Sequence, residues 1–279
     1  MNIPHFDLGG GGQPLHFLHA NGYPPECYKP LFELLQTQYH TFGMHLRPLW
    51  QGPTPEELKS WHPLSDDLLQ FLSSKATSPV IGVGHSIGAI VTLRAALRNP
   101  SKFKALVLID PVLFVPRFIL MWKVVQRLGL ANRMHPLIAG ARKRRRTFSD
   151  LDMVFHRYRH RQVFRYMSDK NLRIYIEGIT RETSTGFELV YSPDWEAQIY
   201  RTSMQDFDLW RGLPDLTVPA LFIRGAETDT FLEPAARLVK RKQPRAWVEA
   251  LDKSTHLLPL ERPQEVFTIM QAFLEQIKT

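Results

Sequence analysis

The chain reads Val80-Ile81-Gly82-Val83-Gly84-His85-Ser86-Ile87-Gly88-Ala89-Ile90-Val91 at the point that decides its fold. A short apolar run, typical of a buried strand, leads into Gly-x-Ser-x-Gly, and a run of helical character follows as far as Leu97. Because glycine has no Cβ, Gly84 and Gly88 let the strand and the helix pass close to a sharp turn that presents Ser86 at the top of a sheet. The strand-turn-helix setting makes Ser86 a candidate nucleophile, whereas the bare pattern arises by chance in many chains.

Short apolar runs alternate with helical patterns on both sides of this stretch, which is the signature of parallel strands joined by crossover helices. The expected fold class is therefore α/β, with a doubly wound and mostly parallel sheet. The predicted strands are residues 15–18, 41–45, 80–83, 105–109, 220–223 and 247–250, and the predicted helices lie near 28–37, 64–74, 87–98, 233–242 and 263–277.

Residues 112–205 break this rhythm, because they are rich in Arg, Met, Phe and Tyr at helical spacing and contain no convincing series of strands. We expect a core domain made of residues 1–111 and 206–279, with a helical lid inserted at 112–205. Apolar side chains of the lid are candidates either for an acyl pocket or for the lid's own core: Phe114, Phe118, Met121, Trp122, Phe155, Phe164, Tyr166 and Met167.

The net charge of +8 is concentrated in this insertion. Residues 117–201 carry 17 Lys and Arg against 8 Asp and Glu, so the rest of the chain has a net charge of −1. No nucleic-acid-binding motif accompanies the basic segment, and we expect no nucleic-acid partner. The run Ala141 to Arg146 is expected on the lid surface or in a loop, either as a solvated charge cluster or as a nuclear-localisation or anion-binding surface.

Length and composition are ordinary for a protein with a sizeable core: 279 residues, of which 44% are hydrophobic. The single cysteine, Cys27, excludes an internal disulfide, and no Cys/His spacing resembles a zinc site. The N-terminal residues lack the order of a signal peptide, and Pro116, Arg117 and Lys123 interrupt the apolar stretch 112–125. These features predict a cytoplasmic protein with no membrane span, and they leave the oligomeric state open.

A serine hydroxyl needs a base within hydrogen-bond reach and an acid that orients the base. In doubly wound hydrolases the three follow one another along the chain as Ser, then Asp or Glu, then His. His256 follows the predicted strand 247–250 and is the expected base, and Asp229 follows the strand 220–223 and is the expected acid. Two other acids remain open for that position: Asp110, which closes the strand 105–109, and Glu227.

With these motifs in order, the chain resembles the α/β-hydrolase superfamily, and in particular its lid-bearing serine esterases. The nucleophile elbow corresponds to residues 84–88, the Gly-x-x-x-Asp acid turn to Gly225–Asp229, and the His-to-Pro close to His256–Pro263. The match covers roughly residues 14–111 and 213–277, while the lid matches only in position. The resemblance implies a small-molecule acyl substrate and no metal or organic cofactor.

An oxyanion hole should accompany this triad, because backbone N–H donors stabilise the negative charge that develops on an attacked carbonyl oxygen. Ile87, directly after the nucleophile, should give one donor. The second should come from the loop His19-Ala20-Asn21-Gly22-Tyr23-Pro24, where the choice between Asn21 and Tyr23 stays open because the loop departs from the usual His-Gly-aromatic pattern. His19 is interpreted as a residue that stabilises the loop, and His85 as one that packs in or lines the site.

A serine at the elbow excludes the superfamily's haloalkane dehalogenases and usual epoxide hydrolases, which use an aspartate there. The leading hypothesis is hydrolysis of carboxylic esters through an acyl-enzyme on Ser86. The alternatives are another serine-dependent reaction, on a thioester, a lactone or a carbon–carbon bond, and a non-catalytic binding protein that retains the fold.

Overall fold

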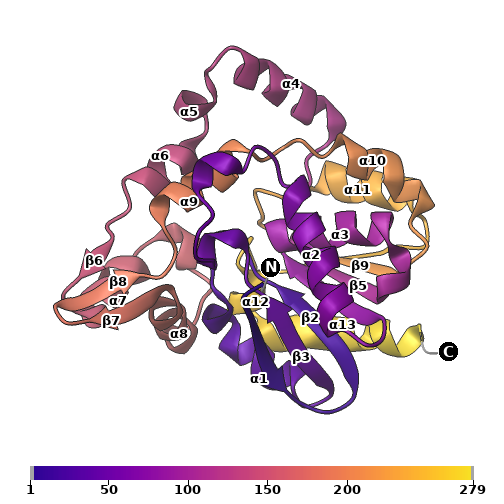
Figure 1. Ribbon diagram of the computed structural model, residues 1–279, viewed down its shortest axis with the longest axis horizontal. Helices are drawn as coiled ribbons and strands as arrows, with labels where there is room; N and C mark the ends of the chain where they lie inside the picture. Colours follow the sequence, from indigo (N-terminus) through magenta and orange to yellow (C-terminus); the bar gives the residue numbers. More distant parts are fainter. Residues whose placement is uncertain (1–2, 278–279) are drawn as a thin grey trace.

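The structure is a computed structural model that describes residues 3–277. Within these residues a seven-stranded sheet has the order β1-β3-β2-β4-β5-β9-β10, and every neighbouring pair is parallel except β1 with β3 (Figure 1). The strands are β1 (His5–Gly9), β2 (Gln13–Leu18), β3 (Tyr39–Met44), β4 (Val80–His85), β5 (Phe103–Ile109), β9 (Ala220–Gly225) and β10 (Trp247–Leu251).

Helices cover both faces of the sheet and bury a separate apolar core on each (Figure 1). Successive side chains of a strand point to opposite faces, so Leu106 and Leu108 of β5 belong to one core, whereas Val107 and Ile109 belong to the other. One face carries α2 (His62–Lys75), α3 (Ile87–Arg98), α10 (Phe207–Gly212) and α11 (Glu233–Lys242); the other carries α1 (Lys29–Leu35), α12 (Leu258–Glu261) and α13 (Pro263–Gln276).

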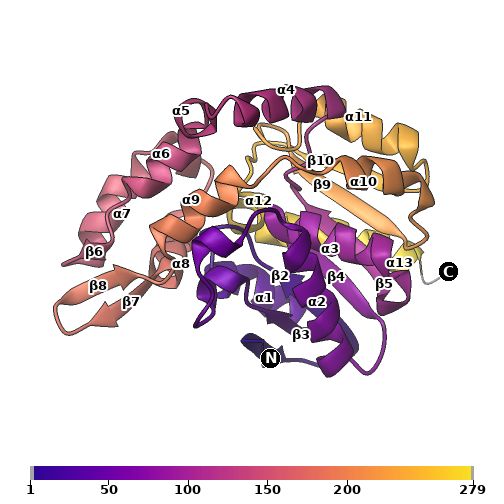
Figure 2. The same ribbon diagram turned by 45° about the horizontal axis from the view of Figure 1, so that its top comes forward.

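Between β5 and α10 the chain forms the cap segment, which we define as residues 112–205. In Figure 2 it describes an arc from beside α11 to a small antiparallel sheet with the order β6-β8-β7. Its elements are α4 (Pro116–Arg127), α5 (Ala131–Met134), α6 (Pro136–Arg142), β6 (Thr147–Phe148), α7 (Leu151–Arg159), α8 (Asp169–Ile179), β7 (Thr180–Thr183), β8 (Gly186–Leu189) and α9 (Pro193–Arg201).

Side chains cap the first turns of α7, α8 and α9, where Asp150, Ser168 and Ser192 accept hydrogen bonds from free backbone amides. Cap and core also meet through backbone carbonyls. Asn171 Nδ2 donates to the Leu260 oxygen, and Gln198 Nε2 donates to the Leu58 oxygen. The cap is therefore held by specific polar contacts in addition to apolar packing.

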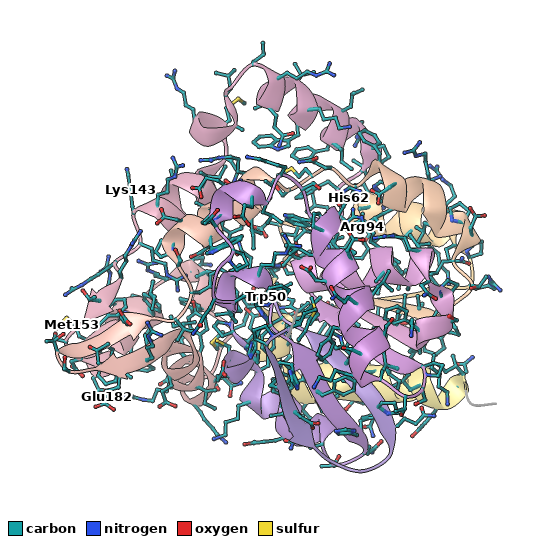
Figure 3. The ribbon with its side chains drawn as sticks, in the orientation of Figure 1. Trp50, His62, Arg94, Lys143, Met153 and Glu182 are labelled. Carbon is teal, nitrogen blue, oxygen red and sulfur yellow. The ribbon has the colours of Figure 1, made fainter. Side chains whose placement is uncertain are left out.

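A buried ion pair fixes the point where the chain returns from the cap to the core. Arg94 of α3 is 2% exposed and contacts Asp206 at 2.6 Å and Asp208 at 2.7 Å, and His62 lies 3.3 Å from Asp208. Figure 3 shows Arg94 and His62 close together. Because one arginine bridges two carboxylates of the returning chain, the start of α10 is tied to the helix that follows Ser86.

The α/β fold class is confirmed, and each of the six predicted strands and five predicted helices is present, with ends shifted by a few residues. Two sequence expectations were incomplete. The edge strand β1 was not predicted, and the cap holds three short strands where only helices were expected. Among residues 3–277, no helix combines the length and the apolar character that crossing a bilayer requires.

Candidate active site

Ser86 lies at a strained turn between β4 and α3. Its backbone has φ 60° and ψ −120°, in the region that non-glycine residues rarely adopt. Only glycines fit around the turn: a Cβ on Gly84 would lie 2.5 Å from the Gly88 backbone, and one on Gly88 would lie 2.1 Å from the Leu18 oxygen. This packing brings the first turn of α3 against the end of β2.

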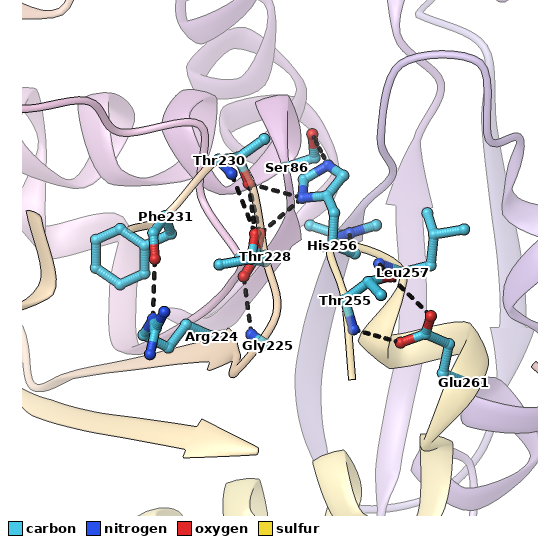
Figure 4. A network of polar contacts seen from close by, with 12 residues as sticks. Ser86, Arg224, Gly225, Thr228, Thr230, Phe231, Thr255, His256, Leu257 and Glu261 are labelled. Carbon is cyan, nitrogen blue, oxygen red and sulfur yellow. Dashed lines mark hydrogen bonds and ion pairs between the residues drawn. The ribbon is translucent and has the colours of Figure 1, made fainter. Parts of the chain in front are cut away.

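A continuous hydrogen-bond chain runs from Ser86 through His256 to Asp110 (Figure 4 shows its first part). His256 Nε2 lies 2.9 Å from Ser86 Oγ, and its Nδ1 lies 2.7 Å from Asp110 Oδ2. The carboxylate accepts from Nδ1–H, which leaves Nε2 free to accept the proton of the serine hydroxyl. The arrangement is that of a nucleophile, a general base and an orienting acid.

The acid partner of His256 differs from our sequence prediction. Asp229 was expected, but Asp110 at the end of β5 makes the hydrogen bond, while Asp229 is exposed and has no hydrogen bond to His256. Glu227, the other alternative, makes no hydrogen bond to His256 among the described residues. It accepts from Arg165 at 2.6 Å and from Tyr166 at 2.5 Å, both in the cap. Both strand ends open at the same edge of the sheet, so the sequence order admitted either aspartate.

The loop after β9 supports Asp110 instead of supplying the acid. Thr228 and Thr230 each donate a hydroxyl to Asp110 Oδ2 at 2.5 Å, and the Gly225 amide donates to Oδ1 at 2.9 Å. Figure 4 shows both threonines converging beside His256. Asp110 itself is completely buried and has φ 40°, a conformation that turns the chain sharply as it leaves the strand.

Charges within the site favour an ionised acid and a basic imidazole. Burial alone would raise the pKa of Asp110, but the hydrogen bond and charge of His256 and the two threonine hydroxyls hold that pKa below its usual value. Burial likewise opposes protonation of His256, yet Asp110 raises the pKa of the imidazole, and Asp229 adds a smaller effect of the same sign. Asp229 therefore acts on His256 only through its charge.

The three candidate oxyanion donors differ in whether their backbone amides already donate a hydrogen bond. The Ile87 amide opens α3, and neither it nor the Asn21 amide has a hydrogen-bond partner among the described residues. The Tyr23 amide, our other candidate, already donates to the Ala20 oxygen at 3.3 Å. The contact of Gly88 with the Leu18 and His19 carbonyls brings the loop of Asn21 beside α3. The geometry thus favours Ile87 and Asn21.

Buried neutral histidines hold this loop in place, and the sequence left the contacts of His85 unspecified. His19 Nδ1 donates to the Ala20 oxygen at 2.9 Å and its Nε2 accepts from the Leu46 amide at 3.1 Å, as a loop-stabilising role requires. His85 Nε2 donates to the His256 oxygen at 2.8 Å, and its Nδ1 accepts from Tyr28 at 2.7 Å. Burial lowers the pKa of both histidines to about 3.

Tyr28 completes this network, because its hydroxyl oxygen accepts the Ala20 amide at 3.1 Å while its proton goes to His85. One chain of hydrogen bonds therefore joins the backbone before Asn21 to the backbone of His256. No motif in the sequence singled out Tyr28, whose role depends on a contact made only in the folded chain.

Two cavities lie beside the site. An apolar one of about 500 Å³ is bounded by α4 and by the loop from Asp229 to Leu232, and its lining includes three of the candidate pocket residues, Phe114, Phe118 and Met121. The other candidates have different surroundings. Trp122 packs on Met204, and Tyr166 donates to Glu227. Phe155, Phe164 and Met167 join the apolar core that α1 and α13 cover, and Phe164 also lines the second cavity.

A second cavity, of about 460 Å³, lies among α6, α7, α8 and α9 and is rich in basic residues. The basic run that ends α6 contributes to it. Lys143 and Arg145 are exposed, as predicted for this run, whereas Arg144 turns inward and pairs with Glu196 at 2.9 Å. Tyr23, from the loop that contains Asn21, also lines this cavity.

Comparison with known proteins gives a consistent result for the whole chain. A family model described as "Alpha/beta hydrolase family" matches residues 17–269. The chain is 18% identical over 271 residues to an (E)-2-((N-methylformamido)methylene)succinate hydrolase of Acinetobacter baylyi, a match that covers 97% of this chain and 94% of that protein. A type I acyl-CoA thioesterase of Penicillium brevicompactum is 31% identical over an alignment of 111 residues, a match that covers 34% of this chain and 25% of that protein.

Solved structures with the same fold include E-2-(acetamidomethylene)succinate hydrolase, with a TM-score of 0.79 at 22% identity, covering 97% of this chain and 94% of that one. A thioesterase domain from the curacin biosynthetic pathway has a TM-score of 0.74 at 15% identity, covering 96% and 94%. At these identities the likeness shows a shared fold, and the substrates of these proteins differ from one another.

Proposed function

Because the chain belongs to the alpha/beta hydrolase family, we propose that it hydrolyses carboxylic esters through an acyl-enzyme formed on Ser86. The observation that carries this proposal is the unbroken chain Ser86–His256–Asp110, with distances of 2.9 and 2.7 Å, at a strained turn. Holding a serine at φ 60° opposes folding, so finding that strain beside a paired histidine and carboxylate favours a catalytic role.

Acylation begins when His256 Nε2 takes the proton of the Ser86 hydroxyl and Oγ attacks the ester carbonyl carbon. The amides of Ile87 and Asn21 then donate to the oxyanion, and the positive end of α3 adds to its stabilisation. Collapse of the tetrahedral intermediate breaks the ester C–O bond, and His256 returns its proton to the departing alcohol. Asp110 stays ionised throughout and stabilises the imidazolium that forms between these transfers.

Deacylation repeats the sequence with water as the nucleophile. His256 takes a proton from water, the hydroxide attacks the acyl-enzyme carbonyl, and the proton passes to Ser86 Oγ as the acid is released. The apolar cavity along α4 is the proposed acyl pocket, because Thr230 lines it and also contacts His256 at 2.9 Å. We propose in addition that the cap segment acts as a lid over this pocket, and that the core domain consists of residues 1–111 and 206–279.

The proposal is tested with a fluorophosphonate probe and p-nitrophenyl butyrate. The wild-type chain should react with the probe at Ser86 and hydrolyse the ester, and Ser86→Ala should abolish both. Ser73→Ala, an exposed serine on α2, is the matched control and should retain both. Ester turnover in Ser86→Ala equal to that of the wild type would refute the mechanism.

Thioester hydrolysis is the second candidate, and it uses the same steps with a thiol as the leaving group. It is favoured by the 111-residue similarity to an acyl-CoA thioesterase and by the basic cavity described above. Comparing kcat/KM for butyryl-CoA with that for p-nitrophenyl butyrate separates the two. A ratio far above one would assign the thioester as the preferred substrate, and a ratio far below one would assign the ester.

A further inference from the structure

The basic cavity of the cap has an excess of positive charge that its own acids do not neutralise. Five cationic side chains line it: Lys143, Arg144, Arg145, Arg157 and Arg161. Glu196 is the one acid among the described lining residues. Neither Lys143 nor Arg157 has a counter-ion among residues 3–277. Figure 3 shows Lys143 on the cap side of the molecule.

The floor of this cavity is built and partly buried, unlike a solvated patch of surface charge. Arg144 is 17% exposed and its guanidinium donates to Glu196 at 2.9 Å and to the Tyr175 hydroxyl at 3.2 Å. Tyr158 and Tyr200 lie in the same lining, and Arg161 lies over the Tyr158 ring at 4.9 Å. Glu196 compensates the buried Arg144, which leaves the other four cations without an acid in the described lining of the cavity.

The cavity adjoins the loop that supplies the proposed oxyanion donor. A Cβ on Gly22 would lie 3.3 Å from the Glu196 carboxyl group and 3.7 Å from Arg144 Nη1. Asn21 Nδ2 donates to the Glu196 backbone oxygen at 3.1 Å, and Tyr23 packs edge-on against His85, next to Ser86. The loop of residues 19–24 therefore contacts the cavity on one side and the neighbourhood of Ser86 on the other.

We propose that this cavity binds an anionic group, a phosphate or a carboxylate, carried by the substrate that Ser86 cleaves. The inference rests on the proposed function for its catalytic half, but anion binding is a separate property. Guanidinium groups match both anions in two-point hydrogen bonding. The exposed Lys143 and Arg157 at the rim have no counter-ion of their own within the described part of the chain, so they attract the anion and pair with it there. With the apolar cavity along α4, the substrate has an apolar acyl part and a charged part.

Binding is measured on Ser86→Ala, which keeps the fold and removes turnover. Coenzyme A supplies phosphates and glutarate supplies carboxylates, and each is titrated calorimetrically at low and at raised salt. Saturable binding of either probe that weakens with salt is expected, and the stronger probe identifies the anion. Replacing both rim residues, Lys143→Gln with Arg157→Gln, should weaken it roughly tenfold. Absence of binding by both probes would overturn the inference.

The matched control is Arg127→Gln, an exposed cap arginine at the end of α4 that does not line the cavity. It should leave anion binding unchanged, and an equal loss in this control would assign the effect to overall charge and overturn the proposal. The rim residues are exposed, so their replacement tests binding without disturbing the buried Arg144–Glu196 pair.

Kinetics supply a second readout. In the wild-type background, the ratio of kcat/KM for butyryl-CoA or a glutarate monoester to that for neutral p-nitrophenyl butyrate should fall roughly tenfold in the rim variant. An unchanged ratio contradicts the inference. If Ser86 reacts with the fluorophosphonate but neither coenzyme A nor glutarate binds, the anion-binding inference alone fails. If one of the two anions binds but Ser86 does not react with the fluorophosphonate, the proposed function alone fails.

Discussion

Replacing Asp110 with asparagine tests the assignment of the acid most directly. The substitution keeps the shape of a side chain that is completely buried. The side-chain amide nitrogen of the new asparagine is itself a donor, and in either of the two orientations of the amide it would face groups that donate. In place of Oδ2 it would meet His256 and the hydroxyls of Thr228 and Thr230, and in place of Oδ1 it would meet the Gly225 amide.

The first orientation forces His256 into the wrong tautomer. The amide donates to Nδ1, the ring proton moves to Nε2, and Nε2 can no longer accept the proton of Ser86 Oγ 2.9 Å away. The second orientation leaves a buried amide unpaired, at a cost of about 1–3 kcal/mol. Neither orientation provides the negative charge that stabilises the imidazolium. In triads of this kind the change lowers kcat by about 10⁴, or about 5.4 kcal/mol at about 1.36 kcal/mol per tenfold.

The assay compares kcat for p-nitrophenyl butyrate in Asp110→Asn and Asp229→Asn, with circular dichroism and thermal unfolding to verify that both variants fold. Asp229 is exposed and acts on His256 only through its charge, so its loss should cost less than about tenfold. The reasoning is refuted if Asp229→Asn loses as much activity as Asp110→Asn, or if Asp110→Asn keeps more than about a tenth of the wild-type rate.

Three further predictions concern the groups around the triad. The first concerns pH. His256 must be neutral to act as a base, and Asp110 outweighs burial and raises the pKa of His256 above 6.5. We therefore expect kcat/KM to rise with pH around a midpoint above 6.5, and Asp110→Asn should move that midpoint to lower pH; a wild-type midpoint at or below 6.5 would contradict this. The second concerns the turn at Ser86. Gly88→Ala places a Cβ 2.1 Å from the Leu18 oxygen and should lower kcat by about a hundredfold or more. The control is Gly11→Ala, whose Cβ would meet nothing within 4 Å, and equal rates in the two variants would exclude the proposed contact of α3 with the oxyanion loop. Tyr28→Phe strands the Ala20 amide and His85 Nδ1 and should lower the free energy of unfolding in urea by about 1–3 kcal/mol, whereas an unchanged midpoint would show that these groups find other partners.

The core strands could be predicted because each is a continuous apolar run bounded by turn residues, as parallel strands covered on both faces must be. The edge strand β1 lacks this signal, since His5–Gly9 is half exposed and pairs antiparallel with β3. The strands of the cap are two to four residues long, which is too short for a clear alternation of apolar and polar residues. The sequence of β7, Thr-Arg-Glu-Thr, also lacks the apolar residues by which a strand is recognised.

Ser86 and His256 could be predicted because the order of residues along the chain restricts them to one turn each. The acid could not, because Asp110 and Asp229 both follow strands whose ends meet at one edge of the sheet. What separates them is the positive φ of Asp110 and the two threonine hydroxyls that reach it from the β9 loop. Thr228 and Thr230, on either side of Asp229, were the available clue, because two hydroxyl donors beside a candidate acid can hydrogen-bond a neighbouring carboxylate.

The two ends of the cap segment are anchored by residues that lie outside it. Asp110 precedes its first residue, and Arg94 holds Asp206 and Asp208 just after its last. Several contacts from cap to core end on backbone carbonyls, such as those of Leu58 and Leu260, which any sequence would present. A chimera spliced after Pro111 and before Asp206 would keep both anchors, so exchanging the segment tests whether it alone sets substrate preference under the proposed function.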